Sequence, residues 1–473
     1  MSEQHWDQTI RNAIHQAPDE LPSVVREKLE ATYRQLPQST RYSRVGKPAL
    51  WICASLVILL AGAFALGFIS PAMAQVLRQL PGIGLAFHTV GDAGVQKVME
   101  DGLATSVGQT VEDKGVAVTL DQVVYDGTRI SIGLLHERNL SINLTPSDSI
   151  RVDGRFLNTG IGGASKDLPD GRSASVFTFS LDEPLPDQFK FEFHFQEVTV
   201  MREGKPRTID GNWWFETPVS KIKEGVREKK FDPPIIREFD GIRIAVTGVT
   251  LTPLTTQIAF DLVKPDRYDP FTTAKDNVSI GDIVIQSDLD FQLLDPKGMI
   301  LEPLGGSGHG MPDEPEHNDR RFAPISLDND ELLLRIVNRQ SKMTKVSDNS
   351  FIGAEQPVIK YYALPDNYPY TVSQGEAGNI TFINMTFEDG QTWVEYEVQG
   401  YEPYTQDSAW WLEDDRGEKY RFDRYDQSRL QDDAYVYKVK LPTISQQSNL
   451  KIAIVEIKPQ KFIDELELVI PLE

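Results

Sequence analysis

The segment GVAVTLDQVVYDGTRISIGLL, residues 115–135, decides the fold. Its apolar residues recur largely at every second position on both sides of a short break at Tyr125-Asp126-Gly127. A period of two is typical of β-strands, whose side chains alternate between the two faces of a sheet. Asp-Gly is a favoured turn dipeptide between such strands. We therefore predict two strands joined by a turn at residues 125–127.

The same arrangement returns twice further along the chain. GIRIAVTGVTLTPLTTQIAFDL covers residues 241–262, and NITFINMTFEDGQTWVEYEVQGY covers residues 379–401. Each copy is followed by a hairpin with a polar turn that contains glycine. A repeat of about 130 residues is too long for a solenoid and favours duplicated β-sandwich domains. We predict a mainly β fold with sandwich domains at 110–232, 233–370 and 371–473.

An uncharged apolar run precedes the β region at residues 49–69. At about 1.5 Å per residue it spans about 30 Å, the thickness of a bilayer hydrocarbon core. Three basic residues stand just before the run (Arg41, Arg44 and Lys47), whereas Arg78 is the one basic residue that follows it closely. This asymmetry predicts a cytoplasmic N-terminus and an extracytoplasmic body. Because a signal peptide has a shorter apolar region and a short leader, we predict a single-pass membrane anchor.

The segment after the anchor, residues 70–109, contains a candidate cleavage site and a short helix. Ala72-Met73-Ala74 has the small-x-small pattern of a signal-peptidase site. Two interpretations stay open: a regulated release site at the outer face, with Ala72 and Ala74 as its recognition residues, or small residues that simply end the membrane helix. Further on, Asp92 as N-cap and Gly102 as terminator predict a short helix between them.

The first 48 residues form a predicted cytoplasmic head of two short helices. Apolar residues recur at helical spacing in both, and prolines separate and end them. Two short helices bury too little surface to be stable alone, so their apolar stripes predict contact with a partner protein. A self-packed hairpin and a poorly ordered tether are the alternatives. The residues expected to carry the partner contact are Trp6, Ile10, Ile14, Val25, Leu29 and Leu36.

Charge and cysteine content exclude several classes of function. The chain has a net charge of -22, and the first 48 residues contribute nothing to the acidic surplus, which lies in the body. An acidic body argues against nucleic acid, anionic lipid and anionic wall polymers as ligands. The single cysteine, Cys53, lies in the apolar run, so neither a disulfide framework nor a cysteine-ligated zinc site is available.

The sequence contains no established catalytic, metal-binding or cofactor motif, and we predict that the protein is not an enzyme and needs no cofactor. Residues 305–321 concentrate His309 and His317 among carboxylates, and a hydrated loop is a better interpretation of them than a cation site. The pairs Trp213-Trp214 and Trp410-Trp411 could provide aromatic platforms for a ligand. In alternating strands, however, one member of such a pair ordinarily lies in the core.

Parts of the chain resemble a family of Gram-positive membrane-anchored proteins that are encoded beside extracytoplasmic-function sigma factors. The resemblance is carried by ISPAMAQVLRQLPGIGLAF (69–87), GDAGVQKVMEDGL (91–103) and DKGVAVTLDQVVYDGTRISIGLL (113–135). The ectodomain of these proteins is of the type called domain of unknown function 4179. GNWWFETPVSK (211–221) resembles the end of that domain, and the later domains resemble its immunoglobulin-like C-terminal module. TIRNAI and VREKLEATYRQLP in the head resemble short sigma-binding segments.

The resemblance implies a transmembrane anti-sigma factor. Its head would bind an extracytoplasmic-function sigma factor, and its outer domains would sense an envelope ligand or protein. The zinc-containing variety of such heads uses a His/Cys cluster that this head lacks, so the zinc-free variety is the one implied. The alternative is a surface-anchored ligand-binding or adhesive protein whose head is only a tether. In either case the lipid bilayer holds residues 49–69, and no nucleic acid is bound.

Overall fold

The computed structural model describes residues 84–473 except for short internal gaps. The gaps are 146–148, 158, 182, 203, 266–278, 280–281, 311–313, 348–349, 354–355, 389, 445–448 and 459. The predicted head (1–48), the predicted membrane span (49–69) and the tripeptide 72–74 all lie outside the described residues. In the described part of the chain, no helix has the length and apolar character needed to cross a bilayer.

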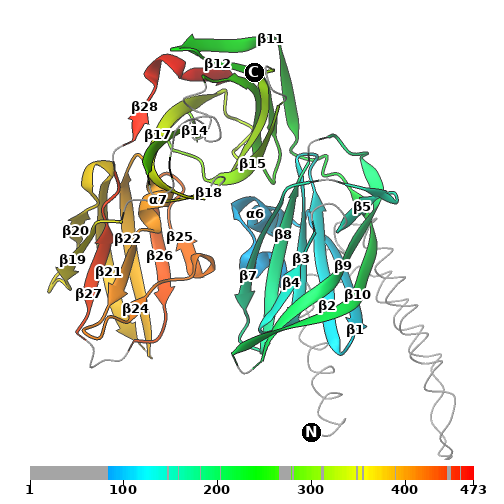
Figure 1. Cartoon of the computed structure of the whole chain (residues 1–473), viewed down its shortest axis with the longest axis horizontal. Helices are drawn as coiled ribbons and strands as arrows, with labels where there is room; N and C mark the ends of the chain where they lie inside the picture. Colours follow the sequence, from blue (N-terminus) through cyan, green and yellow to red (C-terminus); the bar gives the residue numbers. More distant parts are fainter. Residues whose placement is uncertain are drawn as a thin grey trace, which may run out of the picture. The chain divides into compact units, whose positions relative to one another are not determined.

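The described chain is mainly β, which confirms the predicted class (Figure 1). Its strands form six sheets, and the sheets combine in pairs around three buried apolar cores. Two sheets that share one core form the arrangement of a β-sandwich. We call these pairs the first, second and third β unit, in chain order.

The first β unit contains the predicted hairpin. β2 (Val116–Tyr125) and β3 (Arg129–Glu137) pair antiparallel, with Val123 opposite Ile132, so this prediction is confirmed. One sheet has the order β1-β2-β3-β8-β7, and the other has the order β10-β9-β5-β6 with β4 also paired to β9. The other strands are β1 Thr105–Asp113, β4 Leu140–Asn143, β5 Ile150–Val152, β6 Arg155–Phe156, β7 Ile161–Asp167, β8 Arg172–Ser180, β9 Gln188–Arg202 and β10 Lys205–Ser220.

Two short helices, α5 (Leu85–Val90) and α6 (Ala93–Asp101), cover the outer face of the β2-β3-β8 sheet. Phe87 of α5 packs in one apolar cluster with Val124 and Leu135 of the strands. The second half of β2 and most of β3 are therefore buried on both faces, and the alternation of exposure that a one-sided sheet would show is lost there.

Both ends of α6 are fixed by the residues that the sequence singled out. The Oδ1 atom of Asp92 accepts a hydrogen bond of 3.0 Å from the backbone N–H of Val95. Gly102 ends the helix with φ of 69°, and its N–H donates to the Met99 carbonyl. A left-handed residue after the last turn is the usual reason for glycine at this position. The predicted helix between Asp92 and Gly102 is confirmed.

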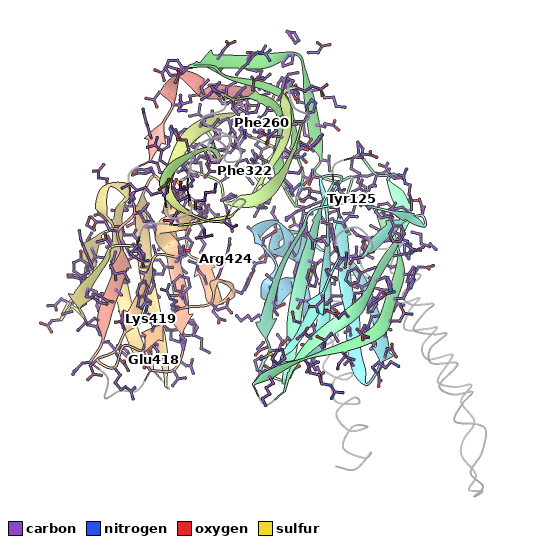
Figure 2. All side chains as sticks on the ribbon, in the orientation of Figure 1. Tyr125, Phe260, Phe322, Glu418, Lys419 and Arg424 are labelled. Atoms are coloured by element: carbon purple, nitrogen blue, oxygen red, sulfur yellow. The ribbon has the colours of Figure 1, made fainter. Side chains whose placement is uncertain are left out.

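The second β unit combines the sheet β11-β12-β13-β16-β15 with the sheet β14-β17-β18. Phe260 and Phe322 are buried in its core (Figure 2). Edge strand β11 (Arg227–Phe239) carries Pro233 and Pro234, which lie where its register with β12 shifts. Prolines are tolerated at such an edge irregularity because they lack the N–H of a regular ladder. The other strands are β12 Ile242–Leu251, β13 Thr256–Val263, β14 Ile283–Leu294, β15 Pro303–His309, β16 Glu316–Phe322, β17 Glu331–Ser347 and β18 Ser350–Gly353.

The end of the chain returns to the second β unit. β28 (Lys461–Phe462) and β29 (Leu468–Pro471) both pair with β17. The predicted third sandwich, 371–473, includes these residues, whereas Leu468 and Ile470 are buried in the second core. The physical reason is that these alternating apolar residues need a covered face, which the long strand β17 provides beside its own core residues.

The third β unit combines the sheets β19-β27-β23-β24 and β20-β21-β22-β26-β25. β21 and β22 form the antiparallel pair predicted for residues 379–401. A short helix, α7 (Pro403–Asp407), follows β22 directly. The strands are β19 Ile359–Ala363, β20 Tyr370–Ser373, β21 Gly378–Glu388, β22 Gln391–Gly400, β23 Trp410–Glu413, β24 Lys419–Tyr420, β25 Gln427–Arg429, β26 Val436–Leu441 and β27 Lys451–Val455. The 3₁₀ turns are η2 Gly375–Ala377, η3 Arg424–Asp426 and η4 Asp464–Leu466.

The β12–β13 turn of the second unit is tied into the helix-covered side of the first. Arg129 donates from Nη2 to the carbonyl of Leu254 at 3.1 Å, and the hydroxyl of Thr252 donates to Oδ2 of Asp126 at 2.6 Å. The side chain of Leu254 is completely buried in the cluster that contains α5 and α6. Gly94 of α6 allows this approach, because a Cβ atom there would lie 1.8 Å from the Leu254 oxygen.

Candidate functional site

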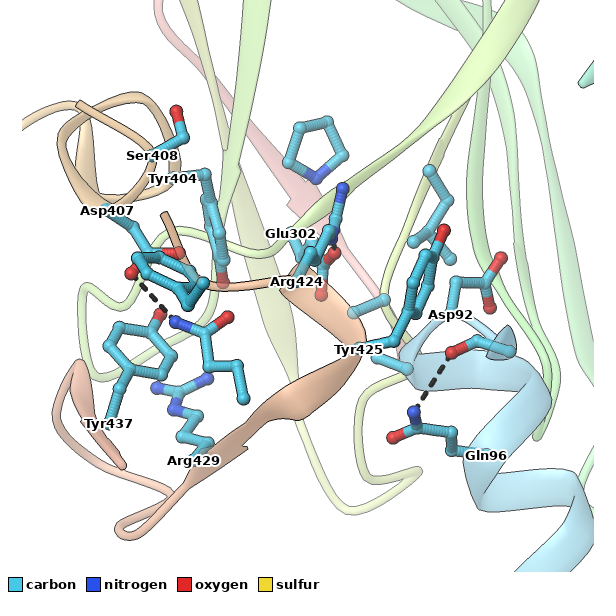
Figure 3. A pocket seen from close by; sticks show the side chains of 17 residues that line it. Asp92, Gln96, Glu302, Tyr404, Asp407, Ser408, Arg424, Tyr425, Arg429 and Tyr437 are labelled. Atoms are coloured by element: carbon cyan, nitrogen blue, oxygen red, sulfur yellow. Dashed lines mark hydrogen bonds and ion pairs between the residues drawn. The ribbon is translucent and has the colours of Figure 1, made fainter. Parts of the chain in front are cut away.

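A cleft of about 530 Å³ lies beside the N-terminal end of α6 (Figure 3). Its volume is within the usual range for small-molecule sites. The cleft is lined by the start of α6, the segment 302–304, Ala323, the end of α7 with Ser408, residues between Phe422 and Arg429, and Tyr437. All but α6 belong to the second and third β units. The cleft therefore depends on the packing of segments that are far apart in the sequence.

Asp407, at the end of α7, is the most deeply buried charged group that lines the cleft. Its side chain accepts hydrogen bonds at Oδ1 from the Tyr396 hydroxyl at 2.5 Å and from Nε2 of Gln427 at 2.8 Å. Burial raises the pKa of Asp407 to about 6, although both hydrogen bonds oppose the rise. Among the described residues, Oδ2 of Asp407 has no hydrogen-bond partner, and Asp407 lines the cleft. One oxygen of this carboxyl group is thus available to a ligand.

Aromatic rings supply much of the apolar lining. They are those of Tyr404, Phe422, Tyr425 and Tyr437. Burial raises the pKa values of Tyr404 and Tyr437 far above the ordinary tyrosine value, so both are neutral phenols. The Tyr404 hydroxyl donates to the carbonyl of Ile300 at 3.1 Å, which ties α7 to the second unit.

The wall formed by α7 is further fixed by a buried carboxylate outside the cleft. Glu402, just before α7, is only 4% exposed. It accepts from Nε2 of Gln292 at 3.1 Å and forms an ion pair with Arg339 at 3.2 Å. The hydroxyl of Thr405 also donates to it at 2.8 Å. These contacts bring partners from β14 and β17 to the helix, so the position of α7 on the second unit is well determined by polar pairing.

The charges around the cleft are largely balanced. Asp92 pairs with Arg129 through contacts of 2.5 and 2.9 Å, and Glu302 pairs with Arg424. Arg429 donates to three backbone carbonyls of the loop that follows it, at residues 431, 432 and 434. Figure 3 shows Arg424 and Glu302 between the group around Asp407 on one side and Asp92 on the other. The arrangement leaves no surplus of positive charge for an anionic ligand.

The chemistry available in the cleft comes from hydroxyl, amide, carboxyl and aromatic groups. The described part of the chain contains no group of three potential metal ligands from His, Cys, Asp and Glu. The hydrogen-bond donors to the Asp407 carboxyl group are the Tyr396 hydroxyl and the side-chain amide of Gln427. Neutral donors and acceptors, aromatic faces and one partly free carboxyl group remain.

The residues predicted from sequence for function lie elsewhere. The partner-contact residues of the head (Trp6, Ile10, Ile14, Val25, Leu29 and Leu36) and the candidate cleavage residues Ala72 and Ala74 fall outside the described part of the chain. His309 and His317 face each other across the β15–β16 hairpin, with ring centroids 5.6 Å apart. His309 lies in strand β15 and His317 in strand β16, not in the hydrated loop that was predicted.

Three of the four paired tryptophans are buried, and Trp214 is half-buried. Trp213 is fully buried, stacks on Phe195 and donates from Nε1 to the carbonyl of Val116 at 2.9 Å. Trp410 and Trp411 are both 1% exposed, and neither lines the cleft. Trp411 is covered by the guanidinium of Arg421 at 4.0 Å. The expectation that one member of each pair lies in the core is met at Trp213, and both members are buried at 410–411.

Sequence reasoning missed the cleft. Tyr404, Asp407 and Gln427 belong to no recognisable motif, and their proximity depends on how α7 and the loop before β26 fold onto β22. A signal was present in YEPYTQDSAWW (401–411). There, a helical turn that begins at Pro403 and ends at Asp407 lies between two strand patterns. That signal indicates a helix on a β domain but does not identify a ligand site.

Comparison with known families identifies the segment around the helices. A model of the family described as Domain of unknown function (DUF4179) matches residues 44–137. This segment is similar to DUF4179 domains. The match confirms the resemblance found in the sequence for that segment. The matched segment contains the apolar run, α5, α6 and the strands β1 to β3, so it includes the α6 wall of the cleft and Arg129.

Solved structures resemble the chain only distantly. The crystal structure of the conserved domain protein from Bacillus anthracis is 15% identical, with 55% of this chain and 81% of that chain covered and a TM-score of 0.40. The crystal structure of bovine butyrophilin is 6% identical, with 48% and 95% covered and a TM-score of 0.12. Neither likeness is strong enough to support an argument about function. No curated protein matches the chain.

Proposed function

We propose that this protein is a single-pass membrane regulator, an anti-sigma factor whose cytoplasmic head holds an extracytoplasmic-function sigma factor inactive. Immunoglobulin-like outer domains would sense the envelope. The observation that carries the proposal is the DUF4179 match, which begins before the apolar run and ends in β3. One matched segment thus contains both the predicted anchor and the helices α5 and α6 of the first β unit. The basic flank before the run supports the orientation with the head inside.

The structure of the outer part is compatible with signalling through α6. This helix begins at Ala93, soon after the apolar run ends in the sequence, and it contacts both the cleft and the β12–β13 turn. A change that loosens or tightens the start of α6 would therefore act directly after α5, the described helix nearest to the predicted anchor in the sequence. No comparable connection is needed for a protein whose head is only a tether.

The cleft also supports the alternative, a surface-anchored ligand-binding or adhesive protein without a regulatory partner. The two functions differ in what the head does. A sigma-factor gene beside the gene of this protein favours regulation, and its absence favours adhesion. Binding of the head to that sigma factor is the decisive property.

The test is a pull-down of the neighbouring sigma factor by the full-length chain in detergent. Leu29→Asp places a charge in the apolar stripe of the second predicted helix and is expected to release the sigma factor. Ala31→Asp adds the same charge roughly on the opposite side of that helix and serves as the matched control. Full retention of the sigma factor by Leu29→Asp, or equal loss with both variants, would contradict the proposal.

A further inference from the structure

We propose that the cleft beside α6 is a binding site for a neutral saccharide. Asp407 and Gln427 would recognise its hydroxyl groups, and the rings of Tyr404, Tyr425 and Tyr437 would contact its apolar faces. The inference rests on the proposed function only in treating the cleft as the place where an envelope signal enters. Binding itself requires no sigma factor.

Charge decides against an anionic ligand. Phosphate and carboxylate ligands are usually held by unpaired arginines or lysines that offer bidentate hydrogen bonds. The cleft has two arginines, of which Arg424 is paired with Glu302 and Arg429 is held by backbone carbonyls. The Asp407 carboxylate would in addition repel an anion, because its Oδ2 atom has no hydrogen-bond partner among the described residues. A neutral ligand fits this balance.

The polar groups match hydroxyl recognition. A sugar hydroxyl can donate to a carboxylate oxygen or to an amide oxygen, so neighbouring carboxylate and amide side chains can hold vicinal hydroxyls. Asp407 and Gln427 provide such a pair. Nε2 of Gln427 donates to Oδ1 of Asp407 at 2.8 Å and to the Tyr396 hydroxyl at 3.0 Å, which leaves the amide oxygen of Gln427 and Oδ2 of Asp407 as the acceptors. The Tyr396 hydroxyl also donates a hydrogen bond of 2.5 Å to the same carboxyl oxygen. The recognition group is therefore fixed before the ligand arrives, which lowers the entropic cost of binding.

The aromatic lining matches the other half of a sugar ring. The C–H groups on each face of a pyranose are apolar and pack well on aromatic rings. Tyrosine also carries a hydroxyl group, so it suits a site that contains water. Tyr404 and Tyr437 stand near Asp407, whereas Tyr425 lies across the cleft near Asp92 (Figure 3). Tyr425 also packs against the α5–α6 cluster. A ligand held between these rings would contact both α7 and the start of α6.

A zwitterionic peptide is the nearest competing ligand, because Asp407 could pair with its ammonium group and Arg429 with its carboxylate. The guanidinium of Arg429 is less suited to that role, since its Nε and Nη2 atoms already donate to the carbonyls of residues 431, 432 and 434. Its plane also lies over Tyr435, at 5.1 Å from the ring centroid. A peptide would have to break these contacts, whereas a sugar would not.

The test measures binding to the purified full-length chain by saturation-transfer NMR and isothermal titration calorimetry. The probes are the neutral trisaccharides of N-acetylglucosamine, glucose (β-1,4 and α-1,4) and xylose, with the dipeptide Ala-Ala and inorganic phosphate as competitors of other classes. Ser408→Trp fills the cleft from an exposed position, and Ser373→Trp places the same ring on an exposed strand of the same β unit. Asp407→Asn removes the carboxylate while keeping an acceptor for Tyr396.

We expect at least one trisaccharide to bind, with at least tenfold weaker binding in Ser408→Trp and in Asp407→Asn and unchanged binding in Ser373→Trp. Thermal unfolding of each variant checks that it is folded. Failure of every trisaccharide, binding that ignores Ser408→Trp, or cleft-dependent binding of Ala-Ala or phosphate instead would overturn the inference. Sigma-factor retention by the same preparation is scored separately. Saccharide binding without a sigma complex supports the site, and a sigma complex without saccharide binding overturns it.

Discussion

The ion pair between Asp92 and Arg129 connects the start of α6 to the β2–β3 hairpin, and its two members are buried unequally. The Arg129 side chain is completely buried, whereas the Asp92 side chain is 25% exposed and lines the cleft. Removing either partner leaves the other unpaired. We predict that Asp92→Asn destabilises the protein more than Arg129→Met does.

The magnitudes follow from what each variant leaves behind. In Asp92→Asn the helix cap is preserved, because asparagine caps as well as aspartate. Arg129 then keeps its charge in a buried site without its direct ion-pair partner and is attracted only by the more distant charge of Asp126. Removing one partner of such a buried pair costs about 4 kcal/mol. In Arg129→Met the unpaired group is a carboxylate that water can reach, so the loss of its charged hydrogen bonds costs about 2 kcal/mol. The double variant removes both members of the ion pair and is expected to recover at least about 1 kcal/mol relative to Asp92→Asn.

The pH dependence provides an independent check. Burial raises the pKa of Asp92, but attraction and hydrogen bonds from Arg129 outweigh it, so the pKa lies below the ordinary 3.8. The stabilisation by this carboxylate is therefore present above pH 3.8 and is lost as the pH falls through the lower pKa of the folded state. Arg129→Met removes the attraction, and we expect acid destabilisation of this region to disappear in that variant.

Hydrogen exchange read by mass spectrometry on the full-length chain is the suitable assay, because it reports on α6 and the 252–255 turn separately from the other β units. Faster exchange is expected in both segments, in the order Asp92→Asn, then Arg129→Met, then the parent chain. Equal exchange in the two single variants, or a double variant worse than Asp92→Asn, would refute the reasoning that the buried unpaired guanidinium is the costly group.

Further predictions concern single positions. Asp407→Asn should raise the unfolding temperature at pH 7–8 and should have the same unfolding temperature as the parent chain near pH 4. The folded-state pKa of Asp407 is about 6 against the ordinary 3.8, so folding favours the protonated carboxyl group by about 3 kcal/mol. This stabilisation is present below pH 3.8 and is lost as the pH rises through 6. Gly94→Ala should cost about 2 kcal/mol and expose the turn at Leu254 to protease, because its Cβ would meet a backbone oxygen at 1.8 Å. Gly102→Ala should cost about 1 kcal/mol in thermal unfolding, since φ there is 69°.

The elements that sequence predicted correctly are those with local causes. The hairpin of residues 115–135 has its turn dipeptide and alternation in one short stretch, and α6 has its cap and terminator within eleven positions. The predicted domain boundary at 233 coincides with two prolines, Pro233 and Pro234. In the structure they sit at a register shift within edge strand β11. Proline lacks a backbone N–H, and this is tolerated both in a linker between domains and at an irregular position of an edge strand.

What sequence could not predict is how distant segments combine. β29 has a clear strand pattern, but nothing local indicates that its partner is β17 rather than a strand of the third unit. Asp407 looks like an ordinary acid after a helical turn, and only the fold places Tyr396 and Gln427 on the same oxygen. The cleft therefore follows from tertiary packing, whereas the strands that form its walls follow from the pattern.

Coupling between the cleft and the head requires more than a connection through α6, because a ligand shifts an equilibrium only by its difference in affinity for two states. The polar contacts of Glu402 hold α7 firmly on the second unit, and the Arg129–Leu254 contact holds that unit on the first. The element left to respond is the start of α6 at Gly91 and Asp92, which lines the cleft on one side and carries the buried ion pair on the other. A ligand that displaces Asp92 from Arg129 would have to supply the about 3 kcal/mol or more that breaking this pair costs. A ligand that leaves the pair intact would instead tighten it, and we expect saccharide binding to slow hydrogen exchange at the start of α6 in the parent chain but not in Arg129→Met.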